Sequence, residues 1–165
     1  MKKASFLRYD CDTRSITDAR YGVRDKSEPQ FPEQNILNTN DMSYKNLDIY
    51  KIAFDLFLKT QKATFLLPKY ELFELGSQLR RSSDSIITNI VEGYGRSYYK
   101  NDYIRFLVFS HASNDETINH LEKIIALYPE FSSEFEILKR DYDVLGGKIN
   151  TYKKWVKENW NENKN

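Results

Sequence analysis

The stretch of sequence that decides the fold is LRRSSDSIITNIVEGYGR, which covers residues 79–96. Within it and just before it, apolar residues recur at helical spacing, at Leu72, Leu75, Leu79, Ile86 and Ile90. This spacing predicts a helix over residues 70–92 that buries one face. Gly93 and Gly95 are predicted to end that helix and redirect the chain, because glycine readily adopts the backbone conformations found at helix ends.

Three further segments show helical periodicity, over residues 45–66, 101–128 and 132–160. The first carries apolar residues on two faces, which predicts a second packing partner and therefore self-association. Gly76 is expected to let another helix approach closely, and the pair at 146–147 is expected to kink the last helix. Four long helices with short connections predict an all-α, antiparallel up-down-up-down four-helix bundle over residues 42–165.

Composition narrows the class of protein. The 165 residues include 25 basic and 24 acidic side chains, and a net charge of +1 argues against a dedicated basic nucleic-acid-binding domain. It leaves room for a local basic patch. The single cysteine, Cys11, excludes an internal disulfide framework. No apolar run approaches the ~20 residues of a membrane span, so we expect a cytoplasmic protein without a membrane partner.

Residues 1–41 differ from the rest of the chain. They contain Pro29, Pro32 and closely balanced charges, with few aliphatic residues in any period. Such a segment cannot bury enough surface to offset its ordering entropy, which predicts a flexible tail. A second interpretation is that Met42 is the biological start and that the preceding residues are an upstream extension.

The second predicted helix also resembles a known family. Its sequence reads QLRR at 78–81, SI at 85–86 and NIVEGYGR at 89–96. This is similar to the pattern QLRRAAxSIPANIAEGYGR of the bacterial four-helix-bundle family named for 23S ribosomal RNA intervening sequences. Ile87 stands where that family usually has proline.

The resemblance extends over about residues 44–157. The segment LDIYK at 47–51 looks like the family's opening pattern, and the third helix shares Phe106-Leu107, Ser113 and Glu116 with it. The resemblance implies a homo-oligomer, with a ring of five subunits as the arrangement associated with the family, and neither enzymatic activity nor a cofactor. A related branch, the accessory proteins of diversity-generating retroelements, binds nucleic acid and a reverse transcriptase, which extends the implied partners to RNA, DNA and that enzyme.

The C-terminal segment is the strongest candidate nucleic-acid interface in the sequence. It combines lysines that could neutralise phosphates with aromatic side chains that could stack on bases, namely Lys148, Lys153, Lys154, Lys157, Trp155 and Trp160. The alternative is an ordinary solvated helix face whose tryptophans pack on the core or on a neighbouring subunit. Arg80, Arg81 and Arg96 form a second candidate set for phosphate binding.

A structural role is the favoured interpretation of the polar residues in the second helix. Arg80 or Arg81 is expected to pair with Glu116 across the second and third helices, because arginine suits bidentate carboxylate pairing. Asn89 and Glu92, with the glycines that follow, are expected to lock the turn. A carboxylate near a helix C-terminus needs a partner, which Arg96, Arg80 or backbone amides could supply.

Catalysis and metal binding are less favoured. His111 and His120 are nine residues apart and fall on different helix faces, so one chain is not expected to join them around a metal. We therefore expect a non-enzymatic helical scaffold whose partner is RNA or another nucleic acid. The alternatives are a protein–protein adaptor, and an enzyme with a bundle-core site formed by Glu92, Glu116 and Arg80.

Overall fold

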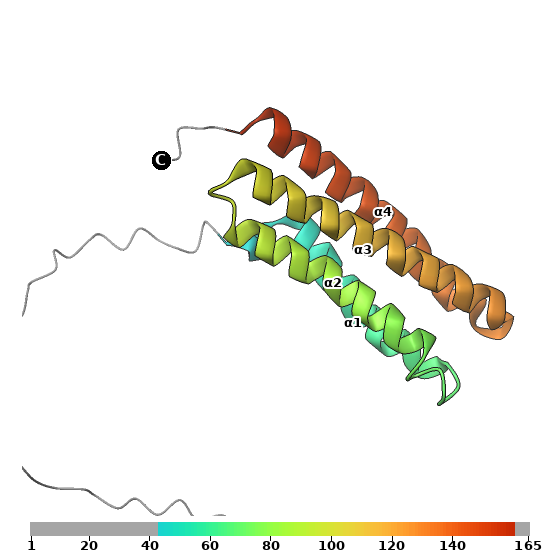
Figure 1. The fold of residues 1–165 in the computed structure, drawn as a ribbon. Helices are drawn as coiled ribbons and strands as arrows, with labels where there is room; N and C mark the ends of the chain where they lie inside the picture. The colour runs from blue at the N-terminus through green and yellow to red at the C-terminus, as the bar shows by residue number, and fades with distance from the viewer. Residues whose placement is uncertain (1–42, 161–165) are drawn as a thin grey trace, which may run out of the picture. The chain divides into compact units, whose positions relative to one another are not determined.

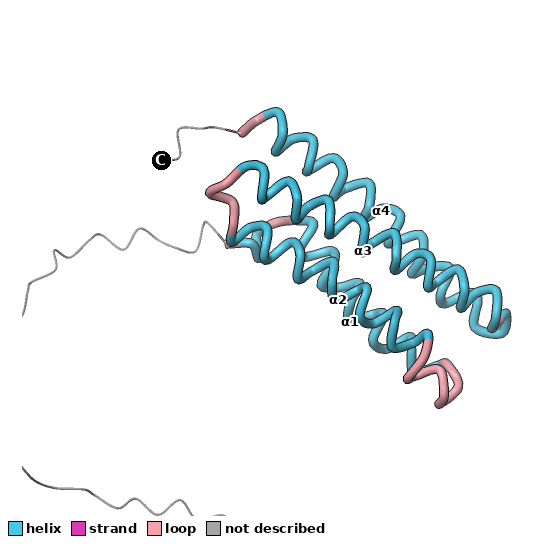
Figure 2. The backbone as a smooth tube through the Cα atoms, in the orientation of Figure 1, coloured by secondary structure: helices cyan, strands magenta, loops and turns pink. Residues whose placement is uncertain are grey.

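A computed structural model describes residues 43–160 of the chain (Figure 1). It contains four α-helices, α1 (Asp48–Ala63), α2 (Leu75–Gly95), α3 (Lys100–Leu127) and α4 (Ser132–Glu158). Short 3₁₀ turns precede α1, follow it and precede α4, at Tyr44–Asn46, Thr64–Leu66 and Pro129–Phe131. Figure 2 shows only helices and loops over the described residues. The predicted all-α bundle is confirmed, whereas the predicted tail and Cys11 lie outside the described residues.

Each helix packs against its neighbours in the chain, and α1 also packs against α4, which closes the bundle. The apolar periodicity of each helix explains this arrangement, because the residues on its inner stripe are the ones that become inaccessible. Residues that are completely buried include Leu79, Ile86, Ile90, Leu107, Leu121, Ile124, Phe135, Leu145 and Ile149. The predicted core face of α2 is therefore confirmed.

The start of α2 differs from the prediction. Residues 68–74 form turns, and the helix begins at Leu75 rather than at residue 70. The buried Glu71 ends the turn region, because its carboxylate accepts a hydrogen bond from the Leu75 amide at 3.1 Å and its carbonyl accepts one from Gly76 at 2.8 Å. A Cβ atom on Gly76 would lie 2.7 Å from the Glu71 carbonyl oxygen. Gly76 therefore accommodates the preceding turn and not a neighbouring helix.

Gly93 lies inside α2 and does not end it. A Cβ atom at this position would lie 2.8 Å from Cβ of Phe106 in α3, so the absence of a side chain allows the two helices to approach closely. The helix ends two residues later at Gly95, after which the Arg96 amide donates to the carbonyls of Glu92 and Gly93 at 3.1 and 3.0 Å.

Gly146 has a similar role between α3 and α4. The helix α4 continues unbroken through residues 146–147, and a Cβ atom on Gly146 would lie 2.8 Å from Nδ2 of Asn114. That amide nitrogen donates to the carbonyl oxygen of Tyr142 at 3.1 Å. The glycine therefore gives a buried asparagine access to the α4 backbone.

Small polar side chains cross the middle of the bundle. The Thr60 and Tyr142 hydroxyls lie 2.8 Å apart and join α1 to α4, and the Thr117 hydroxyl donates to Oγ of Ser82 at 3.0 Å between α3 and α2. These groups are buried, and buried hydroxyls without partners would destabilise the fold. The hydrogen bonds therefore fix how each helix is aligned along its neighbour.

Candidate nucleic-acid interface

The antiparallel topology brings four chain segments to one end of the bundle, as Figure 1 shows. These are the beginnings of α1 and α3 and the final parts of α2 and α4. We call this half of the bundle, residues 43–55, 85–113 and 146–160, the basic end. Its basic residues are Lys45, Lys51, Arg96, Lys100, Arg105, Lys148, Lys153, Lys154 and Lys157, and its acidic residues are Asp48, Asp55, Glu92, Asp102 and Glu158.

The opposite half of the bundle, residues 56–84 and 114–145, has the reverse balance. The excess of acidic residues comes from the last half of α3 and the first half of α4, with Asp115, Glu116, Glu122, Glu130, Glu134, Glu136, Asp141 and Asp143. The near-neutral net charge of the chain thus conceals a separation of charge along the bundle axis.

The four candidate lysines lie on α4 within the basic end. Lys148, Lys154 and Lys157 are exposed and Lys153 is half-buried, and none of the four forms an ion pair with another described residue. Lys154 and Lys157 are three residues apart and share a helix face, whereas Lys148 shares a different face with Trp155, seven residues later. The predicted cluster therefore occupies two sides of α4 near its C-terminus.

The two candidate tryptophans have different surroundings. The Trp155 side chain is 56% exposed, and its ring stacks on Tyr152 at an interplanar angle of 16° with the centroids 5.9 Å apart. Trp160 is half-buried and packs at a tilt against Tyr103, with the centroids 6.3 Å apart. The structure thus places Trp155 where a ligand could reach it and Trp160 against the bundle.

The hydroxyls of Tyr103 and Tyr152 join α3 to α4 beneath these tryptophans, at a separation of 2.9 Å. Burial is the main cause that raises the pKa of both phenols. Both side chains therefore stay neutral at physiological pH and add no negative charge to the basic end.

Two exposed tyrosines also lie at the basic end. Tyr98 and Tyr99, in the turn between α2 and α3, are 65% and 63% exposed, and their rings meet edge to face with the centroids 4.8 Å apart. Lys100 and Arg105 follow them at the start of α3. Sequence reasoning missed these residues, because they come close to the C-terminal lysines only through the antiparallel packing of α3 and α4.

Arg96 is the candidate arginine that belongs to the basic end. It forms an ion pair with Glu92 at 3.0 Å, which confirms one of the predicted partners of that carboxylate. Its guanidinium also lies 5.0 Å from the centroid of the Phe106 ring, so it holds the end of α2 against α3. Asn89 has no role in this turn, contrary to the prediction, because its amide donates to the Ser85 carbonyl one helical turn earlier, at 2.8 Å.

Arg80 and Arg81 lie in the opposite half of the bundle. Arg80 donates hydrogen bonds to the Leu72 carbonyl at 2.6 Å and to the Thr64 hydroxyl at 3.2 Å, which ties α2 to the connection before it. Arg81 is exposed. The structure therefore does not unite these two arginines with Arg96 in one anion site.

The predicted ion pair with Glu116 is absent among the described residues. The Ser82–Thr117 hydrogen bond shows that Arg81 and Glu116 lie near each other along adjacent helices, each one residue from that contact but on opposite sides of it, because α2 and α3 are antiparallel. The Glu116 carboxylate nevertheless lies beside Nε2 of His120 at 3.6 Å, one turn along its own helix. The neighbour of Glu116 is therefore a histidine of its own helix and not an arginine of α2.

The residues considered for metal or catalytic sites are not gathered together. His111 pairs with Asp115 at 3.2 Å, and His120 lies beside Glu116. Across residues 43–160, no group of three or more metal-ligating side chains occurs. Glu92 belongs to the basic end and Arg80 to the opposite half, so the core site envisaged for an enzyme is not assembled in this chain.

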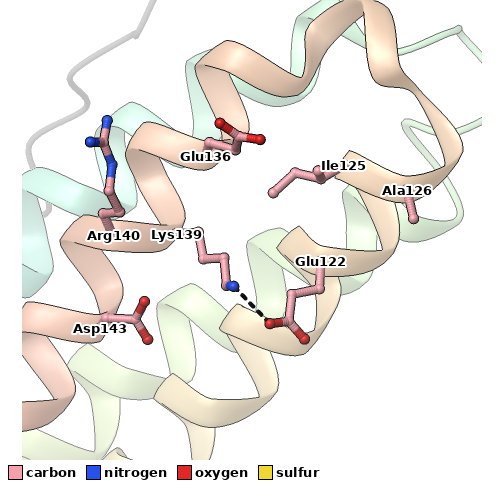
Figure 3. A pocket seen from close by; sticks show the side chains of 7 residues that line it. All are labelled: Glu122, Ile125, Ala126, Glu136, Lys139, Arg140 and Asp143. Carbon is pink, nitrogen blue, oxygen red and sulfur yellow. Dashed lines mark ion pairs between the residues drawn. The ribbon is translucent and has the colours of Figure 1, made fainter.

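A shallow groove lies between α3 and α4 in the acidic part of the bundle (Figure 3). In that view Lys139 and Glu122 point towards each other, and their atoms are 2.8 Å apart. The hydrogen bond to Glu122 raises the pKa of Lys139. The lysine of this groove is therefore already paired, in contrast to the unpaired lysines of the basic end.

Comparison with known proteins identifies the family of the chain. Within residues 43–160, no helix is long and apolar enough to cross a membrane. No curated protein matches the sequence. A family model described as 23S rRNA-intervening sequence protein matches residues 45–151, which include all of α1, α2 and α3 and most of α4. The chain therefore belongs to the 23S rRNA-intervening sequence protein family.

Proposed function

We propose that this protein is a non-enzymatic, self-associating helical scaffold that binds RNA through the basic end of its bundle. The observation that carries the proposal is the separation of charge along the bundle, which concentrates unpaired lysines at one end. The description of the family, which names ribosomal RNA, supports RNA as the partner.

The electrostatic argument concerns the exposed lysines of α4. Lys154 and Lys157 have no acidic partner among the described residues, so they can neutralise phosphates without first breaking an ion pair. Neutralising a phosphate releases the counterions condensed around it, and this release supplies most of the affinity of sequence-independent binding. Self-association would repeat a weak basic patch and raise the overall affinity by avidity.

A pair of matched triple variants tests the RNA-binding surface. Alanine at Lys153, Lys154 and Lys157 removes three charges from the basic end, and alanine at Lys62, Lys69 and Lys123 removes three from the opposite half. We expect fluorescence anisotropy with a labelled RNA at low salt to show weaker binding for the first variant only. Equal losses in both variants, or no binding by the natural protein, would contradict the proposal.

Self-association is supported by the outer face of α1. Phe54 and Leu58 are each 44% exposed, and their spacing of four residues places them on one stripe of α1, while Phe65, which is 75% exposed, follows in the 3₁₀ turn after the helix. This stripe lies on the side of α1 away from the buried Ala53, Leu56 and Thr60.

Light scattering coupled to size-exclusion chromatography tests the assembly. We expect the mass of the natural protein to exceed that of a monomer. The measured mass gives the number of subunits and so tests the ring of five that the resemblance implies. F54S/L58S should shift it towards monomer, and V108S/L127S, which changes two exposed apolar residues of α3, should not. A monomeric natural protein would contradict this part of the proposal.

A protein–protein adaptor is the second candidate function. The exposed apolar stripe of α1 favours it, because such a stripe can receive another protein as well as a second copy of this chain. Two results distinguish the two functions: an adaptor would show no RNA binding at low salt, and it would retain its protein partners after nuclease treatment.

A further inference from the structure

We infer that the basic end binds RNA in an unpaired, single-stranded form, and that the Trp155 indole is a surface on which a base stacks. This inference rests on the proposed RNA binding and specifies the form of the ligand. It is carried by the geometry of the exposed aromatic side chains, which is independent of the charge distribution.

Trp155 forms a supported platform. One face of the indole lies on Tyr152, nearly parallel to it, while more than half of the side chain remains exposed. Tyr152 is itself held by the hydrogen bond between its hydroxyl and that of Tyr103 on α3, at 2.9 Å. A base that stacked on the free side of Trp155 would therefore meet a ring that is already oriented, and binding would cost less conformational entropy.

Positive charges lie around this platform. Lys148 lies two turns earlier on the same face of α4, and Lys154 precedes Trp155 directly. The Thr60–Tyr142 hydrogen bond aligns the antiparallel helices α1 and α4. Lys51, nine residues before Thr60, therefore lies level with Thr151, nine residues after Tyr142. That residue is one helical turn from Trp155. The backbone of a bound strand would therefore have cations within reach on both sides of a stacked base.

The exposed aromatics favour single strands over duplex RNA. In a duplex the base faces are covered by neighbouring bases, and the A-form helix offers mainly phosphates and 2′-hydroxyls to a protein. An aromatic side chain can stack only on a base that is unpaired or displaced. Tyr98 and Tyr99, exposed in the α2–α3 turn at the same end, offer a second such surface. Trp160 packs against Tyr103 and is assigned a structural role.

Tryptophan fluorescence gives a direct test, because the chain has two tryptophans. In W160F the remaining emission comes from Trp155, and we expect a single-stranded oligouridine RNA to quench it on stacking. A blunt-ended duplex RNA of the same length, which has no unpaired loop, should quench it much less. In W155F, which keeps Trp160, neither RNA should cause more than slight quenching.

Affinity provides the second measurement. W155L should weaken binding of the single-stranded RNA by roughly tenfold, which is the effect expected when one base–aromatic stack is removed, and should leave binding of the duplex RNA unchanged. W160L is the comparison for general damage, and thermal unfolding checks that each variant folds. Single-stranded DNA of matching sequence is a further arm, and equal or tighter binding of that DNA would overturn the assignment to RNA.

The outcomes separate this inference from the proposed function. If neither RNA binds at low salt, RNA binding itself fails. A second outcome is that both RNAs bind equally well, that Trp155 is not quenched and that W155L has no effect. In that case the proposed function stands and single-strand stacking is wrong. Quenching of Trp155 by the single strand, together with a selective loss of affinity in W155L, would support the inference.

Discussion

Tyr142 contributes an apolar ring and a hydroxyl group to the middle of the bundle. It is completely buried, and its hydroxyl meets that of Thr60, also buried, at 2.8 Å. The helical periodicity over residues 132–160 predicted the helix that carries this ring. It could not indicate the partner, because Thr60 lies 82 residues earlier and belongs to another helix. Single residues of this kind fix helix alignment, which periodicity alone leaves open.

We predict a pH-dependent effect of the substitution Tyr142→Phe. At pH 7 the variant should be less stable by about 1–2 kcal/mol, because the buried Thr60 hydroxyl loses its partner. Burial raises the pKa of Tyr142 from 10.0 to about 12 in the folded protein. The unfolded chain therefore releases this proton first, and the natural protein should lose up to about 3 kcal/mol of stability as the pH rises from 10 to 12.

The phenylalanine variant has no proton to release at this position, so the difference in stability should shrink or reverse in that pH window. Urea unfolding followed by circular dichroism at pH 7, 9 and 11 measures it. A difference that stays constant across these pH values would show that Tyr142 does not titrate as burial requires.

Gly93 and Gly95 allow a matched comparison of glycine roles. We predict that Gly93→Ala destabilises the protein by about 1–3 kcal/mol, because the new Cβ atom would lie 2.8 Å from Phe106 Cβ and overpack two fixed backbones. Nothing lies within 4 Å of the corresponding atom at Gly95, so Gly95→Ala should be neutral or should stabilise α2 by up to about 1 kcal/mol. Urea unfolding measures both effects, and equal midpoints for the two variants would contradict this distinction.

At the scale of whole elements, hydrophobic periodicity was sufficient to predict the four helices and their inner faces. It failed at the start of α2, where apolar residues continue through a segment that forms turns. There, the buried carboxylate of Glu71 accepts hydrogen bonds from the Leu75 amide at 3.1 Å and from the Tyr128 hydroxyl at 2.6 Å. The two hydrogen bonds of Glu71 thus determine where α2 begins, and no local sequence pattern predicts them.

Arg80 and Arg81 are adjacent in the sequence but belong to different environments. We predict that Arg80→Ala lowers the free energy of unfolding by about 2 kcal/mol, because it removes the charged donor to the Leu72 carbonyl and Thr64 hydroxyl. Arg81→Ala should change stability by less than about 0.5 kcal/mol, since the side chain is exposed and has no bond to another described residue. Chemical denaturation compares them, and equal effects would show that Arg80 does not secure the connection before α2.

At the scale of the molecule, the property that matters most is the distribution of charge. Composition reports a net charge of +1, and the linear sequence reveals the lysine-rich end of α4. Neither shows that Arg96, Lys100 and Arg105 lie at the same end of the bundle, because that follows from the antiparallel order of the helices. The sequence predicted part of the candidate interface, and the topology supplies the rest.

The dependence of RNA affinity on salt tests the central claim most directly. If the basic end neutralises phosphates, the logarithm of the association constant should fall linearly with the logarithm of salt concentration. The slope should become shallower when Lys153, Lys154 and Lys157 are changed to alanine, by roughly 0.7 for each phosphate of a single strand that the variant no longer neutralises. It should stay the same when Lys62, Lys69 and Lys123 are changed. Identical slopes for all three proteins would contradict the assignment of RNA binding to this end of the bundle.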